Sequence, residues 1–109
     1  MTRFTFLLAL LAAAFLAPQT SFAQRTYTFG MIGKSQGNPF FEAARAGAND
    51  AAKELAQKHG IKIKIDWRTP NEEDAQKQAE YIEQLVLNGA DGIIISCSDA
   101  IKLTGAWAG

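Results

Sequence analysis

The sequence has few of the residues from which disulfides, metal centres and acid–base catalysts are built. Its 109 residues include one cysteine, Cys97, and one histidine, His59. A single cysteine cannot form an intramolecular disulfide or supply a cluster of thiolate ligands. Eleven Lys and Arg residues are balanced by eleven Asp and Glu residues, so no excess of positive charge favours binding to nucleic acid. We therefore expect no metal site and no nucleic-acid partner.

Motifs for covalent or cofactor chemistry are also absent from the sequence. It contains neither a GxxxxGK[ST] phosphate loop nor a GxGxxG dinucleotide fingerprint. Lys34 stands beside Ser35, and Cys97 has no base near it in the sequence, so neither forms a recognisable pair of nucleophile and base. We expect no catalytic residues, no cofactor and a protein that is not an enzyme, with Cys97 packed as a small, half-buried apolar residue.

The N-terminal segment has the three parts of a secretory signal peptide. Arg3 supplies the positive charge, residues 4–16 form an apolar run, and Ser21-Phe22-Ala23 places small residues at the two positions that cleavage requires. The apolar run is shorter than the roughly 20 residues that span a bilayer. We expect residues 1–23 to be a signal peptide that is cut before Gln24; the alternative is an uncleaved N-terminal anchor.

The rest of the chain alternates strand-like and helix-like patterns, which predicts an α/β fold with a parallel sheet. The predicted strands are residues 27–33, 61–67 and 93–95, and they are separated by two predicted helices. The first helix begins at Asn38-Pro39 and ends at His59-Gly60, as expected for an N-cap, a proline in the first turn and a left-handed C-terminal glycine. In the second helix, Asn71 and Asp74 have the spacing of a capping box.

Apolar residues at helical spacing predict which face each helix turns towards the sheet. On the first helix they are Phe41, Ala44, Ala48, Ala51, Ala52 and Leu55. On the second helix they are Ala75, Ala79, Ile82, Leu85 and Val86. The strand 61–67 alternates apolar and charged residues and is expected near an edge of the sheet, whereas residues 93–95 are expected to be buried on both faces.

The loops after the three strands are the expected place for a ligand, because ligands of open parallel sheets gather beyond the carboxyl ends of the strands. The first loop carries the amide of Asn38 beside two aromatic rings, Phe40 and Phe41. Aromatic rings stack on the C–H faces of sugars, and amides pair with sugar hydroxyls, so this combination predicts a sugar site. The alternatives are a core position for Phe41 and a purely capping role for Asn38.

The other two loops add a carboxylate and a polar rim. Asp99 follows the third strand and, when ionised, can accept hydrogen bonds from two sugar hydroxyls. Its alternative role is the N-cap of a following helix. Trp67 and Arg68 end the second strand and belong either to the rim of the site or to plain surface.

Several blocks in this order resemble the N-terminal part of periplasmic sugar-binding proteins of the ribose- and galactose-binding type. The blocks are Phe29-Gly30-Met31-Ile32, Asn38-Pro39-Phe40-Phe41, Gly47-Ala48, and residues 89–95 leading into Ser98-Asp99-Ala100. The resemblance implies a Rossmann-like, three-layer α/β/α lobe and a two-lobed receptor that binds a monosaccharide. It also implies a location in the periplasm, delivery of the sugar to the membrane permease of an ABC importer, and a monomer at full length.

Carried over by position, the resemblance assigns the ligand-binding residues. Asn38, Phe40, Phe41 and Asp99 match the asparagine, phenylalanines and aspartate that line the sugar site of the family. Lys34 and Ser35 fall in the same ligand-lining loop, where Lys34 replaces a small polar residue. The identity of the sugar does not follow from these residues.

The resemblance also predicts the domain organisation. Residues 24–104 match only part of an N-terminal lobe, and residues 105–109 are unlike the continuation in the family, so we expect an N-terminal fragment that binds sugar weakly or not at all. The alternative functions are an exported ligand-sensing domain of a chemotaxis or signalling receptor and the sensor domain of a repressor with the same fold. A flavodoxin-like enzyme is a further alternative, but it would need a phosphate-binding loop at residues 34–38.

Overall fold

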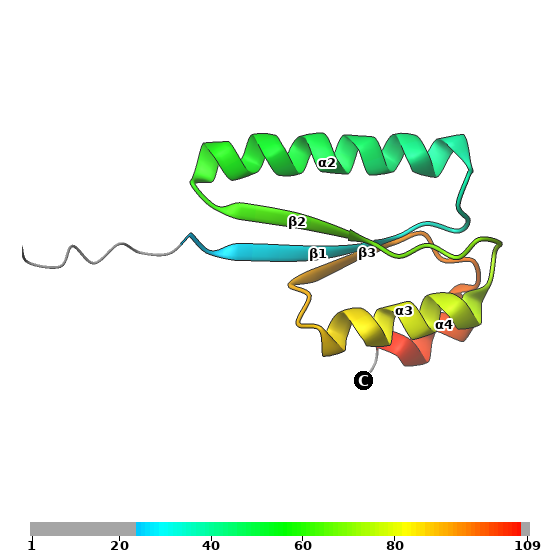
Figure 1. Ribbon diagram of the computed structural model, residues 1–109. Coiled ribbons are helices and arrows are strands. Elements are labelled where there is room, and N and C mark those ends of the chain that lie inside the picture. Colours follow the sequence, from blue (N-terminus) through cyan, green and yellow to red (C-terminus); the bar gives the residue numbers. More distant parts are fainter. Residues whose placement is uncertain (1–23, 108–109) are drawn as a thin grey trace, which may run out of the picture.

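The computed structural model describes residues 24–107, which form a three-stranded parallel sheet with helices on both faces (Figure 1). The predicted signal peptide lies outside the described residues. The elements in chain order are β1 (Thr26–Ile32), α2 (Pro39–His59), β2 (Lys62–Trp67), α3 (Ala75–Leu87), β3 (Gly92–Ile95) and α4 (Ala100–Trp107). The predicted strands and helices are therefore present, with ends shifted by a few residues at most.

The strand order is β2-β1-β3, so the first strand lies in the middle of the sheet. Thr26 pairs with Lys62 at the start of β2, and Ile32 pairs with Ile95 at the end of β3. Helix α2 covers one face, and α3 and α4 cover the other (Figure 1). The predicted three-layer α/β/α architecture is confirmed, and all three strands end at the same edge.

Helix α2 begins and ends where local chemistry predicts. The Phe40 amide donates a hydrogen bond to Oδ1 of Asn38 at 3.0 Å, and Pro39 occupies the first helical position, where no intrahelical donor is lost. At the other end, Gly60 adopts φ 63° and ψ 34°, the left-handed conformation that favours glycine, and its amide donates to the carbonyl of Ala56.

Helix α3 begins later than the predicted capping box suggests. Its N-cap is Asp74, whose Oδ1 accepts a hydrogen bond of 3.0 Å from the Lys77 amide, and the helix starts at Ala75. Asn71 is an exposed residue of the loop that precedes it. The expectation that Asn71 begins the helix is therefore wrong. Asp74 takes over the role because its extended backbone (φ −153°, ψ 102°) places the carboxylate under the third helical amide.

The main core lies between the sheet and the pair α3 and α4. Four fully buried side chains form it, and half-buried Cys97 packs against them, as predicted for that residue. The four are Ile32, Ile82, Leu85 and Leu103. Val86, predicted to face the sheet, is 61% exposed. It lies about 100° around the helix from Leu85, outside the buried stripe.

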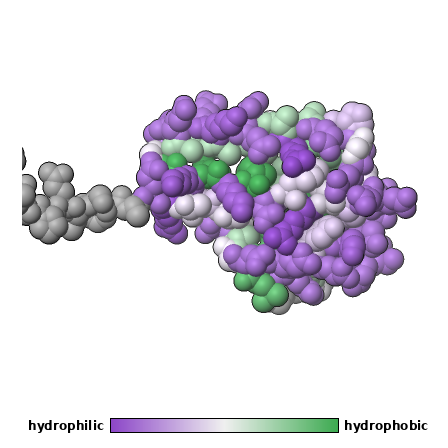
Figure 2. All heavy atoms as spheres, viewed as in Figure 1, coloured by the Kyte–Doolittle hydropathy of each residue, from purple (hydrophilic) through white to green (hydrophobic). Residues whose placement is uncertain are grey.

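The other face of the sheet is less completely covered. Phe41 and Ala52 of α2 are buried, but Leu55 is 43% exposed, so the second half of the predicted apolar face is only partly covered. Figure 2 shows a mostly hydrophilic outer surface on α2, with apolar residues in the band between this helix and the strands. The strand β2 alternates exposed lysines with half-buried isoleucines and lies at an edge of the sheet, as predicted. The expectation that residues 93–95 are buried on both faces is wrong, because β3 forms the other edge and Ile94 is 52% exposed.

Candidate functional site

Three loops meet at the carboxyl edge of the sheet, and we call them the rim loops: residues 33–38 after β1, 68–74 after β2 and 96–99 after β3 (Figure 1). The first and second are joined by backbone and side-chain hydrogen bonds. The Gln36 amide donates to the Pro70 carbonyl at 2.8 Å, and Nε2 of Gln36 donates to the Thr69 carbonyl at 2.8 Å. The first and second rim loops are therefore tied to each other.

The two aromatic rings that follow the first rim loop, at the start of α2, have different environments. Phe40 is 72% exposed, whereas Phe41 is 8% exposed and lies against Gly33. Their ring centroids are 5.1 Å apart with the planes at 89°, an edge-to-face arrangement that is favourable for aromatic pairs. Phe41 is thus a core residue, which is the alternative given for it in the sequence analysis, and its ring packs against that of Phe40. Phe40 offers its ring at the edge where the strands end.

The polar residues predicted for the first loop lie in the turn that precedes this ring. Asn38 is exposed and uses its Oδ1 to cap α2. Lys34 and Ser35 are half-buried in the turn that leaves β1. Gly37 reverses the chain between them and the helix with φ 74°. The loop therefore brings Lys34, Ser35, Asn38 and Phe40 to one edge of the sheet.

Asp99 has the capping role that was its alternative. Its Oδ1 accepts hydrogen bonds from the amides of Ile101 at 3.1 Å and Lys102 at 3.2 Å, at the start of α4. The carboxylate therefore stabilises the positive end of that helix. The residue is half-buried and stands in the third rim loop, next to Ser98, whose Oγ is buried without a hydrogen-bond partner among the described residues.

The end of β2 is occupied by an ion pair. Nε and Nη2 of Arg68 each donate to Asp66 at 3.1 Å, and Nη1 donates to Gln84 of α3 at 2.8 Å. The hydrogen bonds to Asp66 raise the pKa of the Arg68 guanidinium above its ordinary value. The Arg68 side chain thus braces the strand against α3. On the other side, the guanidinium carbon of Arg45 lies 5.1 Å from the centroid of the Trp67 ring.

Two polar residues that the sequence analysis did not single out are more deeply buried than any predicted site residue. Gln78 is 0% exposed and Thr69 is 2% exposed. Both bond to the start of the first rim loop, since Thr69 Oγ1 accepts from the Gly33 amide at 2.8 Å and Gln78 Nε2 donates to the Gly33 carbonyl at 3.0 Å. The signal for Gln78 was its place four residues before Ile82 and seven before Leu85, in the stripe that faces the sheet.

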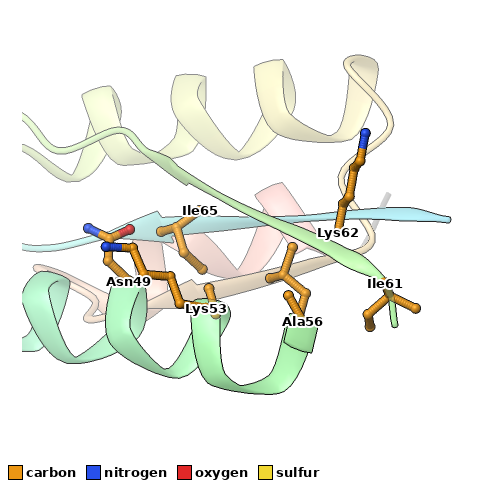
Figure 3. Close-up of a pocket in the computed structure, with 8 residues that line it drawn as sticks. Asn49, Lys53, Ala56, Ile61, Lys62 and Ile65 are labelled. Atoms are coloured by element: carbon orange, nitrogen blue, oxygen red, sulfur yellow. The ribbon is translucent and has the colours of Figure 1, made fainter. Parts of the chain in front are cut away.

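A groove of about 480 Å³ lies at the opposite end of the sheet, between the second half of α2 and β2 (Figure 3). Asn49 and Lys53 extend from the helix on one side, and Ile65 lies on the strand. None of its lining residues belongs to a rim loop, and its open, mixed lining gives no arrangement of convergent polar groups.

Residues 24–107 contain no group of three or more His, Cys, Asp and Glu side chains that could hold a metal ion. Within the same part of the chain, no helix combines the length and the apolar character needed to cross a membrane.

Comparison with known proteins gives three consistent matches. A family model described as the periplasmic binding protein domain matches residues 29–108. The ribose import binding protein RbsB of Bacillus subtilis (strain 168) is 29% identical over 89 residues, which are 82% of this chain and 27% of that protein. The structure of LsrB from Clostridium saccharobutylicum in complex with AI-2 aligns with a TM-score of 0.57 and 30% identity, over 72% of this chain and 22% of that one. The chain thus spans about a quarter of the length of either relative.

Proposed function

The chain belongs to the periplasmic binding protein family, and from this premise we propose that it binds a monosaccharide such as ribose at the rim loops. The observation that carries the proposal is Phe40, a large apolar ring left 72% exposed where the three strands end. The Phe41 ring packs edge-to-face against it, and Lys34, Ser35 and Asn38 precede it in the chain at the same edge of the sheet. A sugar needs this pairing of an aromatic plane with amide and hydroxyl groups.

The relatives support a sugar as the ligand. One is named for ribose import, and the other was solved with AI-2 bound. We extend the role of the ribose import binding protein to this chain. After the protein is exported, it binds the sugar in the periplasm and passes it to the membrane permease of an ABC importer. In this proposal residues 1–23 direct export, the receptor acts as a monomer, and binding involves no chemical change in the sugar.

The contributions of the individual residues differ. Phe40 stacks on the C–H face of the sugar, and the Asn38 amide and the Ser35 hydroxyl exchange hydrogen bonds with its hydroxyls. Lys34 adds donors at the same edge. Asp99 accepts hydroxyl hydrogen bonds through the carboxylate oxygen that does not cap α4. These residues contact one side of the sugar, so the affinity of the chain is expected in the millimolar range, about −4 kcal/mol.

The test is an NMR titration of the ¹⁵N-labelled 109-residue chain with D-ribose, since chemical shifts report weak binding residue by residue. We expect saturable shifts at the amides of residues 34–38, 40 and 98–99, with small shifts along the second half of α2. Phe40→Ala should weaken binding about two- to twelvefold, the equivalent of a lost contact of about 0.5–1.5 kcal/mol.

A matched control separates stacking from general apolar loss. Leu55→Ala removes another exposed apolar side chain from the same helix, at the end away from the rim loops, and should leave the ribose affinity unchanged. Phe40→Tyr keeps the aromatic plane and should retain binding. Ribose-dependent shifts that avoid the rim loops, or equal losses in Phe40→Ala and Leu55→Ala, would overturn the proposed site.

A further inference from the structure

The side chain of Gln78 lies at the point where two of the rim loops leave the sheet. Its Nε2 donates to the carbonyl of Gly33 at 3.0 Å and to the carbonyl of Ser96 at 2.9 Å, and its Oε1 accepts from the amide of Ser98 at 2.9 Å. One amide group thus satisfies three backbone groups, at the end of β1 and at the end of β3. Each donor and acceptor faces a complementary partner, as a buried amide requires.

Thr69 completes the arrangement from the second rim loop. Its Oγ1 accepts the Gly33 amide at 2.8 Å, so the Gly33 residue is held through its N–H by Thr69 and through its C=O by Gln78. A side chain at Gly33 would press against Phe41, because an added Cβ would lie 3.1 Å from Cγ of that ring. The residue that begins the sugar-binding loop is therefore fixed by a bond to the second loop and by a bond to the helix.

The packing of the core does not explain these two polar residues. Gln78 is fully buried on the face of α3 that also carries Ile82 and Leu85, where a leucine would add apolar burial but would leave three backbone groups of the rim loops without this partner. In several proteins, the hydrogen bonds of a buried polar side chain select one arrangement among several that apolar packing would allow. The arrangement that Gln78 fixes is the spacing of the rim loops.

We propose that Gln78 and Thr69 are positioning residues for the sugar site, which they build without touching the sugar. They set the distance between the first loop, which carries Asn38 and leads into Phe40 at the start of α2, and the third loop, which carries Asp99. The loops are thereby ordered before the ligand arrives, so ligand binding loses less conformational entropy. This inference rests on the proposed function. It states that two buried residues, Gln78 and Thr69, determine the positions of the residues that contact the sugar.

The first arm of the test needs no ligand. In Gln78→Met, an apolar side chain of similar length replaces the amide, and we expect lower ¹⁵N heteronuclear NOE values and faster amide exchange at residues 34–38 and 96–99. Ile82→Val is the control, since it removes one methylene from the next turn of the same buried stripe without a bond to any loop. It should lower the melting temperature and leave the order of the loops unchanged.

The second arm measures the affinity for D-ribose. We expect Gln78→Met to weaken binding about tenfold, because the free energy of a lost hydrogen bond that orders the loops is then subtracted from the free energy of binding. Ile82→Val should bind within about twofold of the original chain. Thr69→Val removes the acceptor for Gly33 at constant shape and should also weaken binding. Thr69→Ser restores the hydroxyl and should rescue it. The Thr69 pair decides the question if Gln78→Met does not fold.

The outcomes distinguish this inference from the proposed function. Unchanged loop order in Gln78→Met and Thr69→Val, or affinity that follows melting temperature alone across all four variants, overturns the positioning role. If the original chain shows no ribose-dependent shifts, the proposed sugar is wrong, and the loop-order arm still decides whether Gln78 and Thr69 position the rim loops.

Discussion

The contact between Gly30 of β1 and Leu85 of α3 gives the sharpest test of how the sheet and its covering helix fit. Gly30 is buried, and a Cβ added to it would lie 2.8 Å from Cδ2 and 3.0 Å from Cγ of Leu85, and closer still to Cδ1. Carbon atoms in ordinary contact are about 3.5–4.0 Å apart. Gly30→Ala should therefore force Leu85 or the helix to move, at a cost of about 1–3 kcal/mol of unfolding free energy.

The same geometry predicts strong coupling between the two positions. Leu85 is 0% exposed, so Leu85→Ala alone should cost about 2–5 kcal/mol through lost burial and the cavity left behind. In the double variant the new methyl of residue 30 enters the space that the leucine vacated, and the clash disappears. The double variant should cost less than the sum of the single variants by about 1–3 kcal/mol.

The assay is urea unfolding followed by tryptophan fluorescence, with a stabilising osmolyte present in every sample so that the weakest variant retains a folded baseline. The pair Gly47→Ala and Leu85→Ala is the control. Gly47 lies in α2 on the other face of the sheet, with no atom within 4 Å of an added Cβ, so its cycle should be additive. Additivity within about 0.5 kcal/mol in the Gly30 cycle would refute the close packing on which the argument depends.

Two further predictions concern single positions and are measured by the same unfolding assay. Gly47→Ala should stabilise the chain by about 0.5–1 kcal/mol, because Gly47 is a mid-helix glycine in open space, whereas Gly60→Ala should destabilise it by about 1–2 kcal/mol, because Gly60 has φ 63°; equal effects at both glycines would contradict the left-handed cap. Asp74→Ala should cost about 1 kcal/mol and Asn71→Ala less than about 0.5 kcal/mol, because Asp74 alone caps α3; the reverse order would restore the capping box first expected from the sequence.

The parts of the fold that follow from local chemistry could be predicted from the sequence. Asn38-Pro39 and Gly60 mark the ends of α2 because caps depend on a few neighbouring residues. The alternation of strands and helices fixes a parallel sheet because parallel strands need a crossover between them. The exposed position of Phe40 also follows, since its neighbour Phe41 occupies the face that the helix turns towards the sheet.

The rest depends on contacts between distant residues. Val86 and Leu85 are adjacent and equally apolar, and only the placement of α3 on the sheet decides that Leu85 is buried and Val86 is not. The role of Gln78 depends on backbone groups up to 45 residues away in the chain. Asp99 had two chemically reasonable roles, and its helix-capping bonds are set by where α4 begins. The roles of these residues depend on tertiary contacts, which local sequence patterns do not reveal.

One face of α3 links the stability of this protein to its proposed site. Ile82 and Leu85 lie over the middle of the sheet and join the apolar core, while Gln78, one turn earlier on the same stripe, lies at the carboxyl edge and holds the rim loops. The polar residue of this stripe, Gln78, lies where the strands end, because the backbone groups beyond the sheet have no strand partners and need other hydrogen bonds. Core packing and loop ordering thus belong to successive turns of α3. A substitution at Ile82 should lower stability with little effect on the order of the rim loops. A substitution at Gln78 should lower the order of the rim loops even where Gly47→Ala restores the stability.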